Sequence, residues 1–302
     1  MRNLVSFFRF KLIRFLERIS RPEPLYRLFR PIAVVRAAFK RNPVPLQLPA
    51  VIGTGWITPG DAKCRQRYYQ NCALTFFPER LALPCWRDRC EFAGMDQLRD
   101  LQRQNLPAIL VVCHFGPFFL LRRWLQAAGI RATTLVAGMT DERSYLNQLK
   151  DRVSLFPEIP RVFYPDQLRD VSRFLVNDHV LVIAIDSPAG NQIEVPVDDR
   201  FSFRMATGPL RLAARHGARL FPCTILDAGD WRFRIEIGRP VPAGFLAGPP
   251  DFMAAGKHLV TELLPRFQAH PEQCTKMVLD SFRPIVAKKP RENIAANEEI
   301  LS

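Results

Sequence analysis

The sequence of 302 residues lacks a long apolar run. A membrane-spanning helix needs about 20 consecutive, mostly apolar residues. The uncharged stretch at residues 104–121 falls short of that length and contains His114, Gly116 and Pro117. The N-terminus also lacks a secretory signal pattern, because basic residues interrupt it every few positions. We therefore expect neither a transmembrane helix nor a signal peptide.

Several motifs of catalysis and cofactor binding are also missing. The sequence has no Gly-rich phosphate loop, no G-x-S-x-G nucleophile turn and no internal repeat. Its seven cysteines form no C-x-x-C pair and have no histidine at zinc-ligand spacing. We interpret these cysteines as reduced thiols in a cytosolic environment. Nucleophilic serine chemistry is therefore unsupported, and we expect no metal and no cofactor.

Acidic residues are scarce relative to basic ones. The 43 Lys and Arg outnumber the 29 Asp and Glu, which gives a formal net charge of +14. Residues 1–42 contain eleven Lys and Arg but only Glu17 and Glu23, so nine of the fourteen excess charges lie there. This basic segment contains no recognisable motif for reading nucleic acid. We predict that nucleic acid is not a partner.

Residues 4–19 have the pattern of a basic amphipathic helix, with apolar positions on one face and basic positions opposite. A second basic helix is predicted at residues 25–40. Such helices either pack on their own domain or lie in the interface of an anionic membrane, and we predict membrane association for residues 1–42. The apolar face of the first helix consists of Leu4, Val5, Phe8, Leu12, Phe15, Leu16 and Ile19.

Residues 43–284 are predicted to form one α/β domain, followed by a polar tail at residues 285–302. A connection rich in Pro and Gly opens the domain at residues 42–60. Short apolar runs then alternate with amphipathic stretches, which predicts a mixed, mostly parallel sheet flanked by helices. The predicted strands are 106–113, 132–137, 161–164, 179–186 and, as a half-exposed edge strand, 231–237. The predicted helices are 62–77, 95–103, 142–153, 165–176 and 251–267.

Residues 106–129 have the pattern of a strand, a turn and a helix. The run from Leu106 to Cys113 is almost continuous in Val, Ile and Leu, which is typical of a parallel strand buried on both faces. After Pro117 a helical apolar period begins at Phe118. His114 therefore stands where a strand ends and a helix begins, and open α/β sheets bind ligands at such positions. The alternative is a structural histidine.

Residues 179–186, HVLVIAID, form a second predicted buried strand, which ends in Asp186. Because the ends of parallel strands meet at one edge of a sheet, we expect Asp186 and His114 to open into one cavity. The alternative for Asp186 is a cap of the turn that follows it. Cys113 adjoins His114, but successive residues at a strand end point to opposite faces, which disfavours a Cys/His pair.

Residues 106–129 resemble the first motif of the lysophospholipid acyltransferase superfamily, especially of the bacterial lipid A lauroyl/myristoyl acyltransferases. In that motif a His ends a strand and an acid follows five residues later. The segment after Asp186 also resembles the same proteins, which have an aromatic loop, a Thr-Gly-Pro turn, a helix and a strand with Pro in this order. The likeness covers roughly residues 106–240. The matching residues of the later segment are Phe201, Phe203, Ala206, Thr207, Gly208, Pro209, Leu212, Ala213, Gly217, Ala218 and Pro222.

The resemblance implies that His114 is a general base, which removes the proton of an acceptor hydroxyl as it attacks an acyl thioester. It also implies an acid that orients the imidazole, but Phe119 occupies the position of that acid. Asp186 is the leading substitute, and Glu194 and Asp141 are weaker candidates. Otherwise His114 works alone at a reduced rate, or the chemistry is lost.

Substrate-binding residues are predicted around both motifs. Arginine suits the phosphate of a lipid head group or of a pantetheine arm, and aromatic rings suit an acyl chain. Solvated surface arginines and ordinary core packing are the alternatives. The candidates are Arg122, Arg123, Arg200 and Arg204 for phosphate, Phe118 and Phe119 for an acyl channel, and Thr207 and Gly208 in the matched turn.

The predicted function is transfer of a fatty acyl chain to a hydroxyl or amine of a lipid-like acceptor. The resemblance implies an acyl carrier protein or acyl-CoA thioester as donor, so the donor is a co-substrate and not a resident cofactor. The expected location is the cytoplasmic face of the inner membrane, with peripheral or monotopic attachment. The alternative is a catalytically silent relative that binds lipid or acyl carrier.

Overall fold

The computed structural model describes residues 46–54, 56–57, 81–136, 155–160, 162–176, 179–229 and 232–285, with nine single positions among the first 31. The helices predicted at 62–77 and 142–153 lie outside the described residues. So do the polar tail after residue 285 and most of the N-terminal helices. The domain boundaries at residues 42 and 284 therefore stay predictions.

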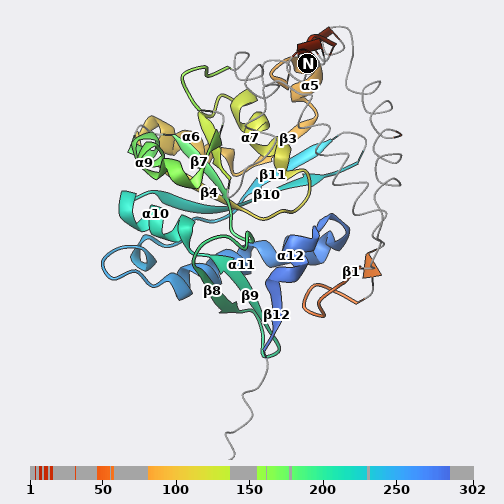
Figure 1. Ribbon diagram of the computed structural model, residues 1–302, viewed down its shortest axis with the longest axis vertical. Helices are drawn as coiled ribbons and strands as arrows, with labels where there is room; N and C mark the ends of the chain where they lie inside the picture. The colour runs from red at the N-terminus through yellow and green to blue at the C-terminus, as the bar shows by residue number, and fades with distance from the viewer. Residues whose placement is uncertain are drawn as a thin grey trace, which may run out of the picture.

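A seven-stranded sheet forms the centre of the protein (Figure 1). Its order is β3-β11-β10-β4-β7-β5-β6, and every neighbouring pair is parallel except the antiparallel pair β10 and β11. The mixed, mostly parallel sheet predicted from the sequence is thereby confirmed. The strands are β3 (Cys90–Ala93), β4 (Ala108–Val112), β5 (Ala132–Leu135), β6 (Val162–Phe163), β7 (Val180–Ala184), β10 (Arg219–Asp227) and β11 (Phe233–Ile237).

Helices cover both faces of this sheet, with α7 on one side and α11 on the other (Figure 1). Because successive residues alternate between faces, Ile109 and Val111 of β4 pack in one core, while Leu110 and Val112 pack in a second core. We call these the α11-side core and the α7-side core. The α7-side core is covered by α6 (Met95–Arg103) and α7 (Phe118–Ala127). The α11-side core is covered by α9 (Leu168–Val176), α10 (Gly208–His216) and α11 (Phe252–Ala269).

A second, antiparallel sheet of three strands lies beside α11, in the order β12-β9-β8 (Figure 1). The sequence-based prediction of an aromatic loop in this segment is wrong, because residues 192–206 form a hairpin. Alternating residues of the hairpin, Val195, Phe203 and Met205, are buried in the α11-side core, which is the pattern of a half-buried strand. The strands are β8 (Gln192–Pro196), β9 (Phe201–Ala206) and β12 (Phe282–Pro284).

The prediction that residues 231–237 form an edge strand is also wrong. β11 pairs with β10 on one side and with β3 on the other, so β3 is the outer strand. The alternation itself was interpreted correctly, because Phe233, Ile235 and Ile237 are buried. The short strand β3 has four residues and carries little periodicity, so the sequence did not indicate it.

Short elements complete the described parts of the chain. Among the described residues, no helix is long and apolar enough to cross a membrane. The remaining elements are β1 (Leu46–Gln47), β2 (Trp56–Ile57), α5 (Pro84–Arg87), α12 (Lys276–Ser281) and the 3-10 turns η2 (Pro165–Gln167), η3 (Ala243–Phe245) and η4 (Pro271–Gln273).

Candidate active site

His114 lies at the centre of a tight turn between β4 and α7. The N–H of Phe115 donates to the carbonyl oxygen of Cys113 at 2.7 Å, which closes a three-residue turn. Gly116 follows with φ of 55°, in the left-handed region that favours glycine. A Cβ at this position would overlap the carbonyl oxygen of Ile225 on β10. The turn therefore needs glycine both for its conformation and for its close approach to β10.

Asp186 reaches His114 from the end of the neighbouring strand. The N–H of Ile185 donates to the carbonyl oxygen of Val112 at 2.9 Å, so the β4–β7 pairing continues to the residue before Asp186. One oxygen of Asp186, Oδ1, lies 2.8 Å from Nδ1 of His114, and the other, Oδ2, accepts the backbone N–H of His114 at 2.8 Å. The structure thus brings together the two strand-end residues that the sequence indicated.

The pair is shielded unevenly from solvent. The side chain of Asp186 is fully buried, whereas 20% of the His114 side chain is exposed. Because a carboxylate only accepts hydrogen bonds, Nδ1 of His114 is the donor in this contact, and in the neutral ring Nε2 is then the acceptor nitrogen. A ring held in one orientation with an unprotonated Nε2 has the form that a general base requires.

Cys113 lies on the other face of the sheet from its neighbour. It belongs to the α11-side core and is only 3% exposed. Burial, followed by the charge of Asp186 and the nearby Cys274, raises the pKa of the Cys113 thiol well above its usual value. A buried thiol that is hard to ionise is a poor nucleophile, so Cys113 does not form a Cys/His pair with His114.

Two aromatic rings flank the imidazole. The ring of Phe118 meets that of His114 edge to face, with centroids 4.6 Å apart, and stacks on Phe119 at 3.8 Å. Both phenylalanines are half-buried and pack against the α7-side core. Phe119 therefore fills the position of the motif acid with an apolar side chain, and Asp186 makes the contact to the imidazole instead.

Residues 75–273 match the sequence model of a family described as "Bacterial lipid A biosynthesis acyltransferase". The match spans about two thirds of the chain and includes both His114 and Asp186. The chain belongs to this family. Its members are acyltransferases, and the family indicates a lipid-like acceptor, so the activity class implied by the sequence resemblance is confirmed at this level. No curated protein matches the chain.

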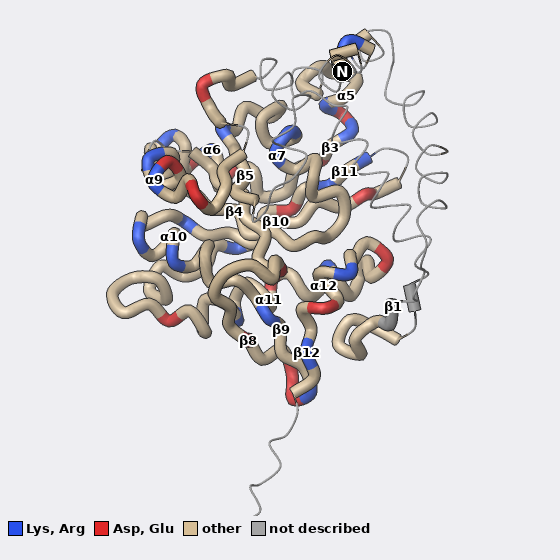
Figure 2. The backbone as a smooth tube through the Cα atoms, in the orientation of Figure 1, with Lys and Arg blue, Asp and Glu red and all other residues tan. Residues whose placement is uncertain are grey.

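The predicted arginines of this family member lie at different depths. Arg122 and Arg123 are in the second turn of α7, where Arg122 is half-buried and Arg123 is only 4% exposed. Both have interaction partners. Arg204 lies on β9 opposite Glu194, and Arg200 precedes that strand and pairs with a neighbouring aspartate. Figure 2 shows basic residues on both α7 and α10.

Thr207 and Gly208 directly follow β9, whose end is joined to the segment that carries Asp186. The N–H of Ala206 donates to the carbonyl oxygen of Ile185 at 2.7 Å, which joins the end of β9 to the residue before Asp186. Thr207 is buried, and its hydroxyl donates to the carbonyl oxygen of Asn191 at 3.1 Å. Gly208 is exposed, and a Cβ there would meet no atom within 4 Å. Arg200, at the far end of β9, is about 20 Å away along the strand.

The two weaker acid candidates do not reach His114 in any described contact. Glu194 lies on β8, where its Oε2 is 3.5 Å from the Ser202 hydroxyl. Asp141 lies outside the described residues. Of the three carboxylates considered from the sequence, Asp186 is the one that the structure places against the imidazole.

Sequence reasoning missed the segment of residues 273–275 in this family member. The carbonyl oxygen of Gln273 accepts the N–H of Gly116 at 3.0 Å, and the N–H of Thr275 donates to the carbonyl oxygen of His114 at 3.3 Å. Phe115 and Cys274 form an antiparallel bridge between these contacts. The sequence around Gln273 is polar and lacks periodicity, so it gave no signal of a role in the site.

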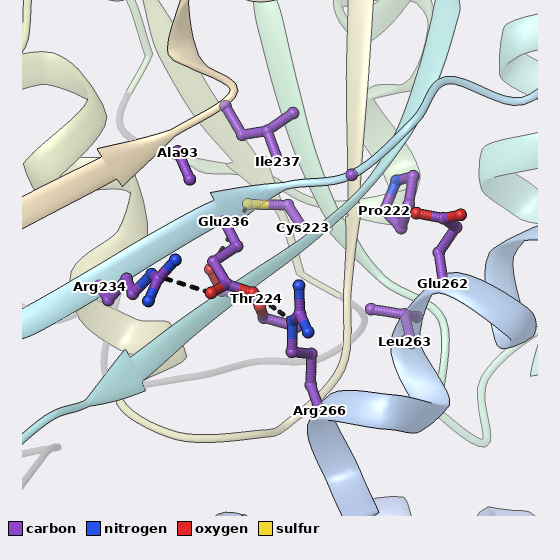
Figure 3. Close-up of a pocket in the computed structure, with 11 residues that line it drawn as sticks. Ala93, Pro222, Cys223, Thr224, Arg234, Glu236, Ile237, Glu262, Leu263 and Arg266 are labelled. Atoms are coloured by element: carbon purple, nitrogen blue, oxygen red, sulfur yellow. Dashed lines mark hydrogen bonds and ion pairs between the residues drawn. The ribbon is translucent and has the colours of Figure 1, made fainter. Parts of the chain in front are cut away.

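A cavity of about 120 Å³ lies between α11 and strands β10 and β11, and its drawn lining residues do not include His114 or Asp186 (Figure 3). Its charged side chains neutralise one another. Glu236 pairs with both Arg234 and Arg266, and Glu262 pairs with Arg239 at the margin. Among the described residues, no cluster of three potential metal ligands occurs.

Proposed function

We propose that this chain transfers a fatty acyl group from a thioester to a hydroxyl or amine of a lipid-like acceptor, with His114 as general base and Asp186 as its orienting acid. The observation that supports this most directly is the double contact between Asp186 and His114, both at 2.8 Å. Asp186 thereby takes the role of the motif acid, whose position is occupied by Phe119.

The proposed reaction needs only the side chains of this pair and the two substrates. Nε2 of His114 takes the proton of the acceptor hydroxyl while the oxygen attacks the carbonyl carbon of the thioester. The carbon–sulfur bond then breaks, and the imidazolium returns the proton to the departing thiolate. Asp186 stabilises the imidazolium during this sequence because its buried carboxylate faces Nδ1.

The proposed donor is an acyl carrier protein or acyl-CoA thioester, in keeping with the resemblance to lauroyl and myristoyl acyltransferases. The half-buried rings of Phe118 and Phe119 beside the imidazole support an acyl chain or other apolar group at this point. The exposed Gly208 at the start of α10 and the half-buried Arg122 are the proposed contacts for phosphate.

The proposed place of action is the cytoplasmic face of the inner membrane. Four apolar residues of the N-terminal segment, Leu4, Phe8, Leu12 and Phe15, are helical and each more than half exposed. They recur every three or four residues and therefore share one helix face, and Lys11 and Arg14 add positive charge. An exposed apolar stripe with cations beside it suits the interface of an anionic bilayer.

A catalytically silent relative that binds lipid or acyl carrier is the second candidate, and Phe119 is the observation in its favour. The deciding experiment incubates the purified protein with radiolabelled lauroyl-acyl carrier protein or lauroyl-CoA and a membrane lipid extract. We expect label to move into a lipid, and we expect His114→Ala to lower the rate of transfer by about 10²–10⁴. Absence of transfer with either donor would favour the silent relative.

A further inference from the structure

The side chain of Gln273 pairs with the backbone of Asp227 in both directions. Its Oε1 accepts the N–H of Asp227 at 3.0 Å, and its Nε2 donates to the carbonyl oxygen of Asp227 at 2.9 Å. Gln273 is 7% exposed, so both bonds are shielded from water. Asp227 is the last residue of β10, so the amide of Gln273 binds the backbone of that strand at its end.

The backbone of the same residue holds the turn of His114. Gly116 donates its N–H to the carbonyl oxygen of Gln273 at 3.0 Å, and two residues later Thr275 donates to the carbonyl oxygen of His114 at 3.3 Å. A Cβ at Gly116 would approach Oε1 of Gln273 to 3.1 Å, which shows that the side chain also lies close to the turn. Gln273 thus ties the turn of His114 to the end of β10.

His114 is consequently held from both neighbouring strands. On the side of β7, Asp186 binds its N–H and its ring; on the side of β10, residues 273–275 bind the turn through its backbone. The contact between Asp186 and the imidazole depends on the position of this turn, because a shift of the backbone moves the ring with it. A displacement of about 1 Å can lower an enzymatic rate roughly 100-fold.

We propose that Gln273 is a positioning residue for His114. It holds the turn at the distance from β7 at which Asp186 contacts both the backbone N–H and Nδ1 of His114. The proposal rests on the function proposed above for His114, and it adds a residue that acts through the turn and not on substrate. A glutamine that served stability alone would hold the end of β10 without affecting the imidazole, and the two roles are separable by observing the ring.

The test uses the full chain with ¹⁵N-labelled histidine. The protein has five histidines, and the spectrum of His114→Ala identifies the signals of His114. Gln273→Met removes both bonds to Asp227 at similar volume, while Gln273→Glu keeps the oxygen that accepts the N–H of Asp227 and removes the N–H donor. Gln126→Met is the matched control. Gln126 is 2% exposed and lies near the C-terminal end of α7, away from the turn of His114, and its Nε2 donates to the carbonyl oxygen of Ala132.

We expect Gln273→Met to displace the ring signals of His114 and to lower kcat about 10- to 100-fold with little change in KM. Gln273→Glu should give a smaller displacement, and Gln126→Met should lower Tm without moving these signals. Unchanged signals in folded Gln273 variants, or an equal displacement in Gln126→Met, would overturn the proposal. So would failure of both Gln273 variants to fold, because Gln273 would then support the whole fold. Wild-type protein without transfer activity removes the proposed function, but the ring signals still decide the role of Gln273.

Discussion

The ring of Phe118 meets the imidazole of His114 edge to face, with the two planes inclined by 71°. Phe119 stacks behind Phe118, so a continuous aromatic surface runs from the imidazole into the α7-side core. The position that carries the acid in the resembling motif is thus part of an apolar wall, and Asp186 reaches the imidazole from the end of β7.

Phe119→Asp should destabilise the protein without increasing transfer. Asp186 already accepts from Nδ1 of His114, so the new carboxylate would lie against apolar side chains without that partner. We expect a loss of about 2 kcal/mol or more in the free energy of unfolding, measured by urea denaturation. Phe119→Leu, which keeps the site apolar, is the control and should lose less. A higher kcat in Phe119→Asp would show that His114 lacks an orienting acid in the native chain.

His114→Ala and Asp186→Asn should each lower kcat by about 10²–10⁴. An asparagine can place an N–H group where Asp186 presents Oδ1, and His114 must then accept at Nδ1 and carry its proton on Nε2. The ring would keep its place but lose its basic nitrogen. Initial rates with saturating lauroyl-acyl carrier protein, at matched amounts of folded protein, measure the effect. Wild-type rates in Asp186→Asn would exclude Asp186 as the orienting acid.

Deleting residues 1–40 should abolish binding to anionic liposomes. The wild-type chain should bind vesicles that contain phosphatidylglycerol but not neutral vesicles, because its exposed cations are attracted to anionic lipid. Binding should weaken as the salt concentration rises, because salt screens this attraction. Vesicle co-sedimentation at two salt concentrations measures this. The paired substitution Phe8→Ser and Phe15→Ser should weaken binding without altering the charge. Equal partition of the deleted and full chains would assign the segment to the fold.

Labelling of cysteines should separate exposed from buried thiols. Burial raises the pKa of Cys113 and of Cys274, so at any given pH fewer of these thiols are ionised, and the thiolate is the reactive form. Labelling of both should stay low as pH rises from about 7 to 9, whereas the exposed Cys85 should react. Peptide mass spectrometry after iodoacetamide treatment, with a sample in urea as the control, checks the outcome. Rapid labelling of Cys113 in the native protein would contradict its burial.

The parallel centre of the sheet was predictable because its strands are buried on both faces. A strand such as β4 must be apolar at nearly every position, and this pattern differs from that of a surface helix. The hairpin of β8 and β9 was missed because the resemblance indicated a loop there, although buried positions such as Val195 and Phe203 alternate with polar ones. Its neighbours along the sheet come from the C-terminal strand β12, which no local pattern could indicate.

The contact of His114 with Asp186 was predictable for the same reason as the sheet. Two parallel neighbouring strands end at one edge, and the polar residue at each end was visible in the sequence. Gln273 was not predictable, because its role depends on a loop that returns to the turn from the far end of α11. The burial of Arg123 was also not predictable. Arg122 and Arg123 are adjacent on a helix, and the sequence does not indicate which of the two faces inward.

The acid and the base of this site are 72 positions apart in the chain, whereas the motif they resemble places them on one turn and helix. The contact between His114 and Asp186 therefore cannot form until β4 has paired with β7. This pairing is non-local and is slow compared with helix formation. Its appearance would mark a late stage in the folding of the central sheet. The ring signal of His114, followed during dilution from urea, consequently reports when that pairing occurs. A fragment that ends before residue 180 should never show the native ring signal.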